Sequence, residues 1–115
     1  MELQKSLLIG MVKPLSVVDK MLRSQGFSRR GRDAITYDIQ IEDVASHTVY
    51  YLRIPARRTS DIESKDTFIK LDRPYLGKRR GPHRYHSSWE IPSSVVEAAQ
   101  HKMAEVASYL KTTNN

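Results

Sequence analysis

The chain contains no cysteine, and this absence excludes several classes of protein at once. Without a thiol there is no disulfide framework, no thiolate nucleophile and no cysteine-based zinc site. No apolar run approaches the roughly 18 residues of a transmembrane helix. A signal peptide is not expected either, because Glu2 precedes the short N-terminal apolar run and no small-residue cleavage site follows it. We therefore expect a cytoplasmic protein with no membrane association.

Glycine and proline are also scarce, with five of each among 115 residues, and no linker rich in either divides the chain. A chain of this length buries about two-thirds of its unfolded surface, which is enough for one domain without a metal or a disulfide. We expect residues 1–115 to form a single domain, with residues 111–115 as a frayed tail.

Two patterns near the N-terminus predict a strand and then a short helix. The run LLIGMV, within residues 3–12, has the length and apolar composition of a strand. The stretch that begins at Ser16 resembles a capping box, and the apolar spacing after it predicts a helix over residues 16–25. Gly26 suits the left-handed residue that closes a helix, with Phe27 folding back as in a Schellman motif.

The central region changes to the period of two that is typical of strands with one buried face. Pro55 is expected to stop the second of these strands, because proline cannot donate a ladder hydrogen bond. The predicted strands cover residues 35–42, 47–54, 67–71 and 83–90, with Tyr85 and Trp89 on one face of the last.

The clearest element is a C-terminal helix that ends at about residue 111. It follows Pro92, a second capping box is expected at Ser94, and apolar residues continue at helical spacing from Val96 to Leu110. The predicted order is β-α-β(4)-α. Such elements bury one another in a two-layer α+β domain, an antiparallel sheet packed by a long C-terminal helix and a short N-terminal helix.

No motif singles out a catalytic site, so we expect no catalytic residue and no cofactor. Neither a G-x-S-x-G nucleophile elbow nor a G-x-x-x-x-G-K-[ST] phosphate loop is present. His83 and His86 form H-x-x-H, but a spacing of three places two residues on opposite faces of a strand. A metal-assisted enzyme that uses these two histidines is therefore the third interpretation, behind two kinds of binding protein.

Positive charge is concentrated in the central region. The net charge is +6, and no acidic residue lies between Arg73 and Trp89. Arginines beside aromatic residues can contact phosphates and stack bases, although they also serve to solvate exposed strand edges. Contact with an anionic ligand or nucleic acid, most of it through residues 78–86, is the alternative function. The candidate residues are Arg53, Lys78, Arg79, Arg80, His83, Arg84 and His86.

The second strand carries apolar residues on both of its faces, which favours self-association. Val49 and Tyr51 point outward if Leu52 and its neighbours of like parity point inward. A homodimer through the open sheet face would cover these two residues, as would a loop. The first interpretation is therefore a non-enzymatic binding or interaction module that forms a homodimer.

Several stretches together resemble the YugN-like family, small uncharacterised proteins of spore-forming bacteria. The resemblance is carried by TYD, YYLRIPA, IKL-x-x-PYLGK, the Pro82-His83 dipeptide and IP-x-x-VVEAA, and it covers about residues 35–110. It implies a TBP-like arrangement of elements, β-α-β(4)-α. It does not imply DNA binding, because a shared fold does not carry a function.

This chain departs from the family pattern directly after the LGK triplet. Relatives typically carry a histidine and aromatic residues there, whereas this chain has Arg79-Arg80-Gly81. The departure weakens the case for a shared histidine metal site. It also makes the basic character of this segment partly particular to this chain.

Overall fold

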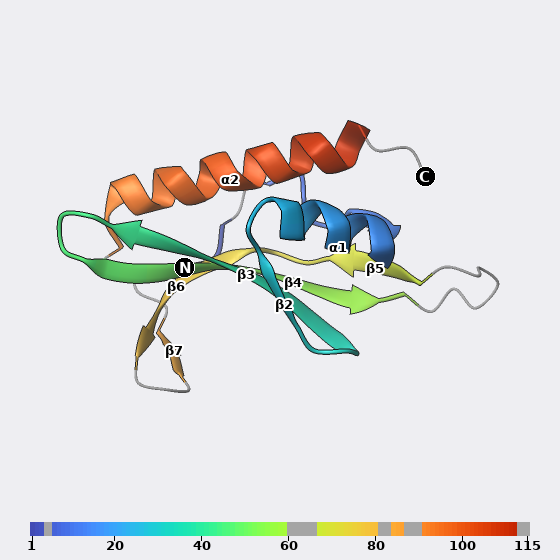
Figure 1. Ribbon diagram of the computed structural model, residues 1–115, viewed down its shortest axis with the longest axis horizontal. Helices are drawn as coiled ribbons and strands as arrows, with labels where there is room; N and C mark the ends of the chain where they lie inside the picture. Colours follow the sequence, from blue (N-terminus) through green and yellow to red (C-terminus); the bar gives the residue numbers. More distant parts are fainter. Residues whose placement is uncertain (4–5, 60–66, 81–83, 87–90, 113–115) are drawn as a thin grey trace.

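The computed structural model describes residues 1–3, 6–59, 67–80, 84–86 and 91–112. Two helices lie on one face of an antiparallel sheet, and a hairpin projects from the sheet on the side away from the long helix (Figure 1). The predicted α+β class, with one sheet and two helices, is confirmed. No helix among these residues has the length and apolar composition needed to cross a bilayer.

Six strands lie between the two helices, where the sequence predicted four. The additional ones are a short strand directly after the first helix and a strand formed by the PYLGK segment. The elements are β1 (Val12–Pro14), α1 (Leu15–Ser24), β2 (Ser28–Arg30), β3 (Ala34–Asp43), β4 (Thr48–Arg58), β5 (Phe68–Leu71), β6 (Tyr75–Arg80), β7 (Arg84–His86) and α2 (Ser93–Thr112).

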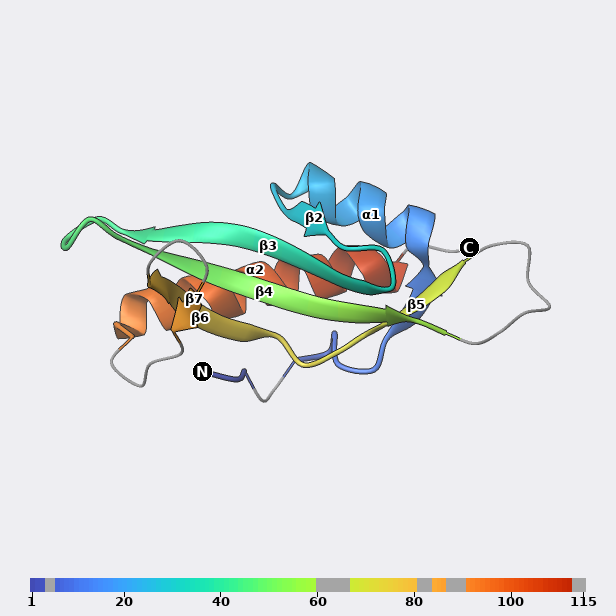
Figure 2. The same cartoon turned by 90° about the horizontal axis from the view of Figure 1, so that it is seen from below.

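The long strand β4 organises the sheet. Along one edge it pairs with β3 over ten positions, and along the other it pairs first with β6 and then with β5. β1 lies outside β5, and β2 lies outside β3. β5 and β6 are therefore two parts of one neighbouring edge, interrupted at residues 72–74 (Figure 2).

Pro55 does not stop β4, which continues to Arg58. The carbonyl oxygen of Pro55 accepts a hydrogen bond from the N–H of Asp72, 2.8 Å away. In a strand the N–H and C=O of one residue point to the same side, so the missing proline N–H faces the interruption between β5 and β6. Proline is tolerated here because the neighbouring edge has a break at this position.

The N-terminal apolar run does not form the predicted strand. Residues 7–10 form a turn, and only Val12–Pro14 pairs with the sheet, against β5. Gly10 has a positive φ of 82°, and its N–H donates to the carbonyl oxygen of Leu71 at 2.8 Å. A left-handed residue reverses the chain, so Leu8 enters the core while Leu7 remains 75% exposed.

The first helix matches its predicted extent but not its predicted cap. α1 begins at Leu15 after Pro14, and no side chain caps its N-terminus, so Ser16 lies inside the helix. The C-terminus follows the prediction: Gly26 has a φ of 98°, and the N–H of Phe27 donates to the carbonyl oxygen of Leu22 at 2.9 Å. This is the 6→1 hydrogen bond of a Schellman motif.

The second helix covers the centre of the sheet. It begins at Ser93, so Ser94 is not at the cap position that the sequence predicted, and it ends at Thr112. Residues 111 and 112 are therefore helical rather than part of a frayed tail, and residues 113–115 lie outside the described chain.

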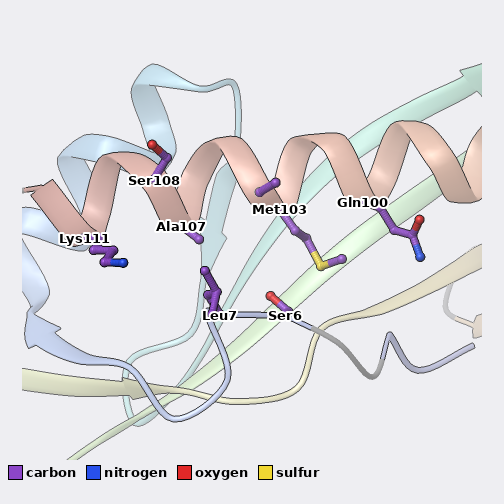
Figure 3. Close-up of a pocket in the computed structure, with 8 residues that line it drawn as sticks. Ser6, Leu7, Gln100, Met103, Ala107, Ser108 and Lys111 are labelled. Carbon is purple, nitrogen blue, oxygen red and sulfur yellow. The ribbon is translucent and has the colours of Figure 1, made fainter.

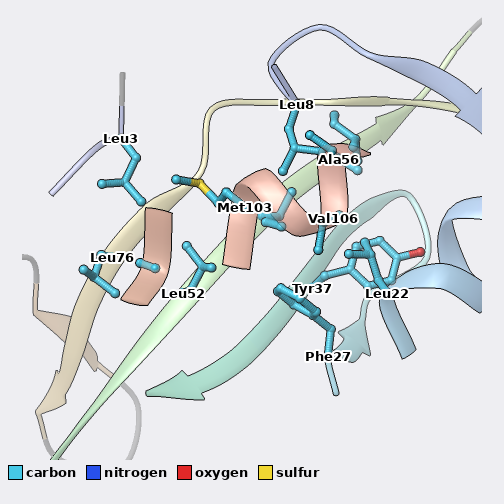
Figure 4. Packing of buried hydrophobic residues seen from close by; sticks show 14 of the residues in the cluster. Leu3, Leu8, Leu22, Phe27, Tyr37, Leu52, Ala56, Leu76, Met103 and Val106 are labelled. Carbon is cyan, nitrogen blue, oxygen red and sulfur yellow. The ribbon is translucent and has the colours of Figure 1, made fainter. Parts of the chain in front are cut away.

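The core lies between the helices and the inner face of the sheet (Figure 4). Each large aliphatic side chain that is fully buried there contributes about 1.5–3 kcal/mol. The side chains of β3 and β4 that point into the core are those that the period of two predicted. Helix α2 contributes the apolar stripe that its helical spacing predicted. Among the most buried side chains are Ile35, Tyr37, Leu52, Ile54, Leu76, Ala99, Val106 and Leu110.

The predicted fourth strand is shorter than expected and is one half of a hairpin. β7 covers only Arg84–His86 and pairs with β6, a strand that the sequence analysis did not predict. Trp89 lies outside the described residues, so its predicted orientation is not tested. In β6, Leu76 is directly opposite Leu52 of β4, and both side chains are buried. Their burial favours pairing of this segment with the sheet.

Candidate functional site

The outer face of the sheet is the side opposite the helices, and no helix in the described part of the chain covers it (Figure 2). Register places Val49, Tyr51, Arg53 and Pro55 of β4 on this face, because they alternate with the buried residues of the strand. Val49 and Tyr51 lie where the sequence predicted them, and both are half-buried.

A buried ion pair lies at the centre of the outer face. Asp38 of β3 is directly opposite Arg53 of β4, and the guanidinium donates to both carboxylate oxygens, from Nε at 2.7 Å and from Nη2 at 3.0 Å. Tyr75 of β6 lies across from Arg53, with its hydroxyl 3.4 Å from Nη1. Asp38 is only 7% exposed although no second layer covers it. The polar side chains of this cluster shield one another from solvent.

The cluster holds the arginine in its charged form. The hydrogen bonds that Arg53 donates to Asp38 are the largest cause that raises the pKa of Arg53 above its ordinary value, and burial opposes them. A second guanidinium approaches the same carboxylate, with Nε of Arg30 3.9 Å from Oδ2 of Asp38. Arg53, predicted as an anion contact, is thus engaged by a carboxylate of its own chain.

A polar hollow of about 390 Å³ lies beside this ion pair. Ser28 and Arg30 of β2, Gln40 of β3 and Tyr51 of β4 contribute to its lining. The Gln40 side-chain amide donates to the Tyr51 hydroxyl at 3.3 Å. The hollow forms because the pairing between β2 and β3 reaches only to Ser28, opposite Asp38. Beyond that pair, no described strand lies beside the remainder of β3 on that side.

The predicted basic residues are divided between two places. Arg53 is in β4, opposite Tyr75 at the start of β6, whereas Lys78, Arg79 and Arg80 are in the later part of β6. Arg80 is directly opposite Arg84 in the hairpin.

The candidate histidines are only partly described. His86 is opposite Lys78 in the hairpin register, and His83 lies outside the described residues. Among the described residues, no three His, Asp or Glu side chains gather in a way that could hold a metal ion. Nothing there supports the metal-assisted enzyme.

A second carboxylate with several partners was missed by the sequence analysis. Asp19 of α1 accepts hydrogen bonds from Nε of Arg23 at 2.8 Å, from Nη1 of Arg29 at 3.2 Å and from the Tyr37 hydroxyl at 3.2 Å. Only the pair with Arg23 has a sequence signal, the i,i+4 spacing. The cluster joins α1 to β2 and β3.

The ion pair on the outer face had a sequence signal of its own. A turn centred between Ala45 and Ser46 places residue 38 opposite residue 53, and the observed register has this pairing. An acid and an arginine at directly opposed positions predict a cross-strand ion pair. The predicted bounds, 35–42 and 47–54, centre the turn one residue earlier and place residue 38 opposite residue 51, so the pair is found only with the observed register.

Comparison with known proteins yields a match in structure alone. No family model matches the chain, and no curated protein does. A solved structure, the crystal structure of the uncharacterized conserved protein YugN from Geobacillus kaustophilus HTA426, is 28% identical and superposes with a TM-score of 0.77. The match covers 96% of this chain and 95% of that one. The sequence motifs and this end-to-end likeness together support the resemblance to the YugN-like family.

Proposed function

We propose that this protein is a non-enzymatic interaction module that forms a homodimer through the outer face of its sheet. The observation that carries the proposal is the buried Asp38–Arg53 pair on a face without a covering layer. Burying unpaired charges in an interface costs several kcal/mol, but these charges are already paired and out of water. A partner that covers them removes little further hydration.

The side chains around the ion pair suit a protein interface. Tyr51 lies two positions before Arg53 on the same face of β4, and Tyr75 lies opposite Arg53 on β6. Aromatic residues and arginine are enriched at interfaces. A standard interface removes about 800 Å² per partner, roughly a tenth of the 7465 Å² surface of this chain. Closed two-fold pairs are the commonest oligomers, and one face packed on its own copy satisfies that symmetry.

The test is the mass of the protein in solution, measured by light scattering after size-exclusion chromatography. We expect twice the 13.3 kDa of the chain for the unmodified protein and for Tyr109→Lys, a matched change on the exposed side of α2. Tyr51→Lys should return the mass to that of one chain. An unmodified protein that remains monomeric at millimolar concentration would exclude the dimer, as would a dimer that Tyr51→Lys leaves intact.

The basic hairpin favours a second function, contact with a polyanion. Arg80 and Arg84 face each other in the register, as do Lys78 and His86. The hairpin also projects from the sheet on the side away from the long helix (Figure 1), where a nucleic-acid strand can reach it. A bound phosphate chain relieves the repulsion between opposed cations and releases its own counterions.

Binding of a fluorescent single-stranded oligonucleotide, followed by anisotropy over a range of salt concentrations, tests this function. We expect affinity to fall steeply with salt, and the Ala variant of Arg79, Arg80 and Arg84 to lose most of it. The slope of log affinity against log salt should shrink by about 0.7 for each lost contact. Replacing the exposed Lys20, Arg57 and Lys70 removes the same charge elsewhere. Equal losses in both triple variants would show net charge alone and refute a hairpin site.

A further inference from the structure

A groove of about 540 Å³ lies on the helix side of the molecule, between the N-terminal turn and one face of α2 (Figure 3). Its volume is within the usual range for small-molecule sites. Met103 and Ala107 line its floor and are buried, while Ala104 on the next position of the helix is exposed. Because two lining residues are alanines, the surface of α2 is a shallow trough rather than a ridge.

The wall of the groove is formed by Leu7, whose side chain is 75% exposed. A large apolar side chain in water beside an apolar trough gains from any ligand that covers both. The wall is held in place before a ligand arrives, because the N–H of Leu8 donates to Oγ of Ser6 at 3.1 Å and that of Gly10 donates to the carbonyl oxygen of Leu71 at 2.8 Å. A preformed wall lowers the entropy cost of binding.

The two ends of the groove differ in charge. Lys111 lies at one end and Gln100 at the other, with Leu7 and the floor between them (Figure 3). Lys111 is the only charged residue of the lining, and it forms no ion pair with any carboxylate that the structure describes. The distance from Gln100 to Lys111 is about 16 Å along the helix, at 1.5 Å per residue. One cation therefore lies at the end of a long apolar trough.

We propose that this groove binds a single amphiphile with an anionic head and an unbranched alkyl chain, a long-chain carboxylate. The head pairs with the Lys111 ammonium, and the chain lies along Ala107, Met103 and Leu7. A peptide helix, about 10–12 Å across with its side chains, is too wide for a trough of this volume. The site is on the opposite side of the sheet from the proposed dimer face, so either can be disproved without the other.

The probe is dodecanoate below its micelle concentration, with binding followed by calorimetry and by amide NMR shifts. We expect saturable one-to-one binding, with shifts confined to residues 6–10 and 100–111. Dodecanol, which has the same chain without charge, should bind about threefold to fivefold more weakly, the size of a partly screened ion pair. Acetate, the head without the chain, should produce no shifts in these residues.

Two pairs of variants locate the site. Ala104→Leu fills the trough from an exposed helical position and should weaken dodecanoate binding about tenfold or more, whereas Ala98→Leu, also exposed on α2, should not change it. Lys111→Met should remove the preference for dodecanoate over dodecanol, whereas Lys20→Met on α1 should retain it. Leucine is a good helix former, and circular dichroism confirms that both leucine variants fold.

If Ala104→Leu did not fold, Leu7→Ser would replace it, because Leu7 is exposed and its removal leaves the core intact. This variant should weaken dodecanoate binding several-fold. Shifts that map to the outer sheet face, equal binding of dodecanol and dodecanoate, or equal effects of Ala104→Leu and Ala98→Leu would each overturn the proposal.

Discussion

The two faces of the β3–β4 ribbon share one backbone register, but their side chains become buried in different ways. On the inner face, Leu52 and Ile54 are fully buried because they lie in the hydrophobic core on the helix side of the sheet. On the outer face, Asp38 reaches 7% exposure with no described helix above it, because Arg53 contacts both oxygens of its carboxylate and Arg30 approaches one of them. Burial on one face results from packing between layers, and on the other from polar groups that cover one another.

This difference determines how each face responds to change. When an apolar core side chain is truncated, the protein loses the transfer free energy of the removed atoms, and a cavity remains. A buried ion pair is different, since its desolvation cost is compensated only while both partners are present. The stability contributed by the outer face should therefore depend on whether both partners of the ion pair are present, rather than on the size of any one side chain.

The largest effect should come from truncating the inner face. Leu52→Ala removes a fully buried side chain from the central strand and should lower the free energy of unfolding by about 4 kcal/mol. Tyr51→Ala, at the adjacent position on the outer face, should cost less than half as much in the monomer. Urea denaturation measures both, and an equal loss would show that the outer face is packed as tightly as the core.

A slightly smaller effect should follow from breaking the outer ion pair. Arg53→Met leaves the Asp38 carboxylate buried without its bidentate partner and should cost about 3 kcal/mol. Arg30→Met, which removes only the 3.9 Å contact, should cost less than about 1 kcal/mol.

The double variant Asp38→Leu/Arg53→Met distinguishes the two explanations for the outer face. If burial there depends on mutual pairing, the double variant should recover most of the stability lost in Arg53→Met. If the double variant is as unstable as the sum of its single changes, the two side chains act independently.

A dependence of stability on pH, of moderate size, should come from Tyr37, which is buried on the helix side of β3. Burial, followed by the charge of Asp19 and its hydrogen bond, raises the pKa of Tyr37 above its ordinary value of 10.0, and Arg29 opposes the shift. The unfolded chain loses this proton near pH 10 while the folded chain keeps it. The contribution to stability is therefore complete below pH 10 and is lost progressively above it.

Alkaline titration by ultraviolet absorbance measures this effect. The chain has six tyrosines, and one of them should ionise only when the protein unfolds. Tyr37→Phe should remove that late phase and lower stability at neutral pH by about 1 kcal/mol, the value of one hydrogen bond. A late phase that persists in Tyr37→Phe would assign it to another tyrosine.

The smallest effect should come from Pro55. Its missing N–H faces the break between β5 and β6, so Pro55→Ala should change stability by no more than about 0.5 kcal/mol. The matched change is Thr36→Pro, at the directly opposed position, which is paired on both sides. That proline should cost more than about 2 kcal/mol because it removes a ladder bond. Equal effects would show that the position of the break is irrelevant.

The parity of β3 and β4, the closing of α1 at Gly26 and the stripe of α2 were all predictable, because each depends on a local period or a single glycine. The turn in LLIGMV was not, since a short apolar run has no period of its own. The continuation of β4 through Pro55 was not either. Whether proline is tolerated depends on the neighbouring edge, which is formed by residues far along the chain.

The sequence by itself determined which residues are apolar on each face and where the helices end. Those features depend on neighbours within a few positions. Only the tertiary structure decided that β5 and β6 share one edge of β4, that Asp19 joins α1 to β2 and β3, and that Leu7 faces α2 across a groove. These arrangements involve segments distant in sequence, and the chain must fold before their side chains meet.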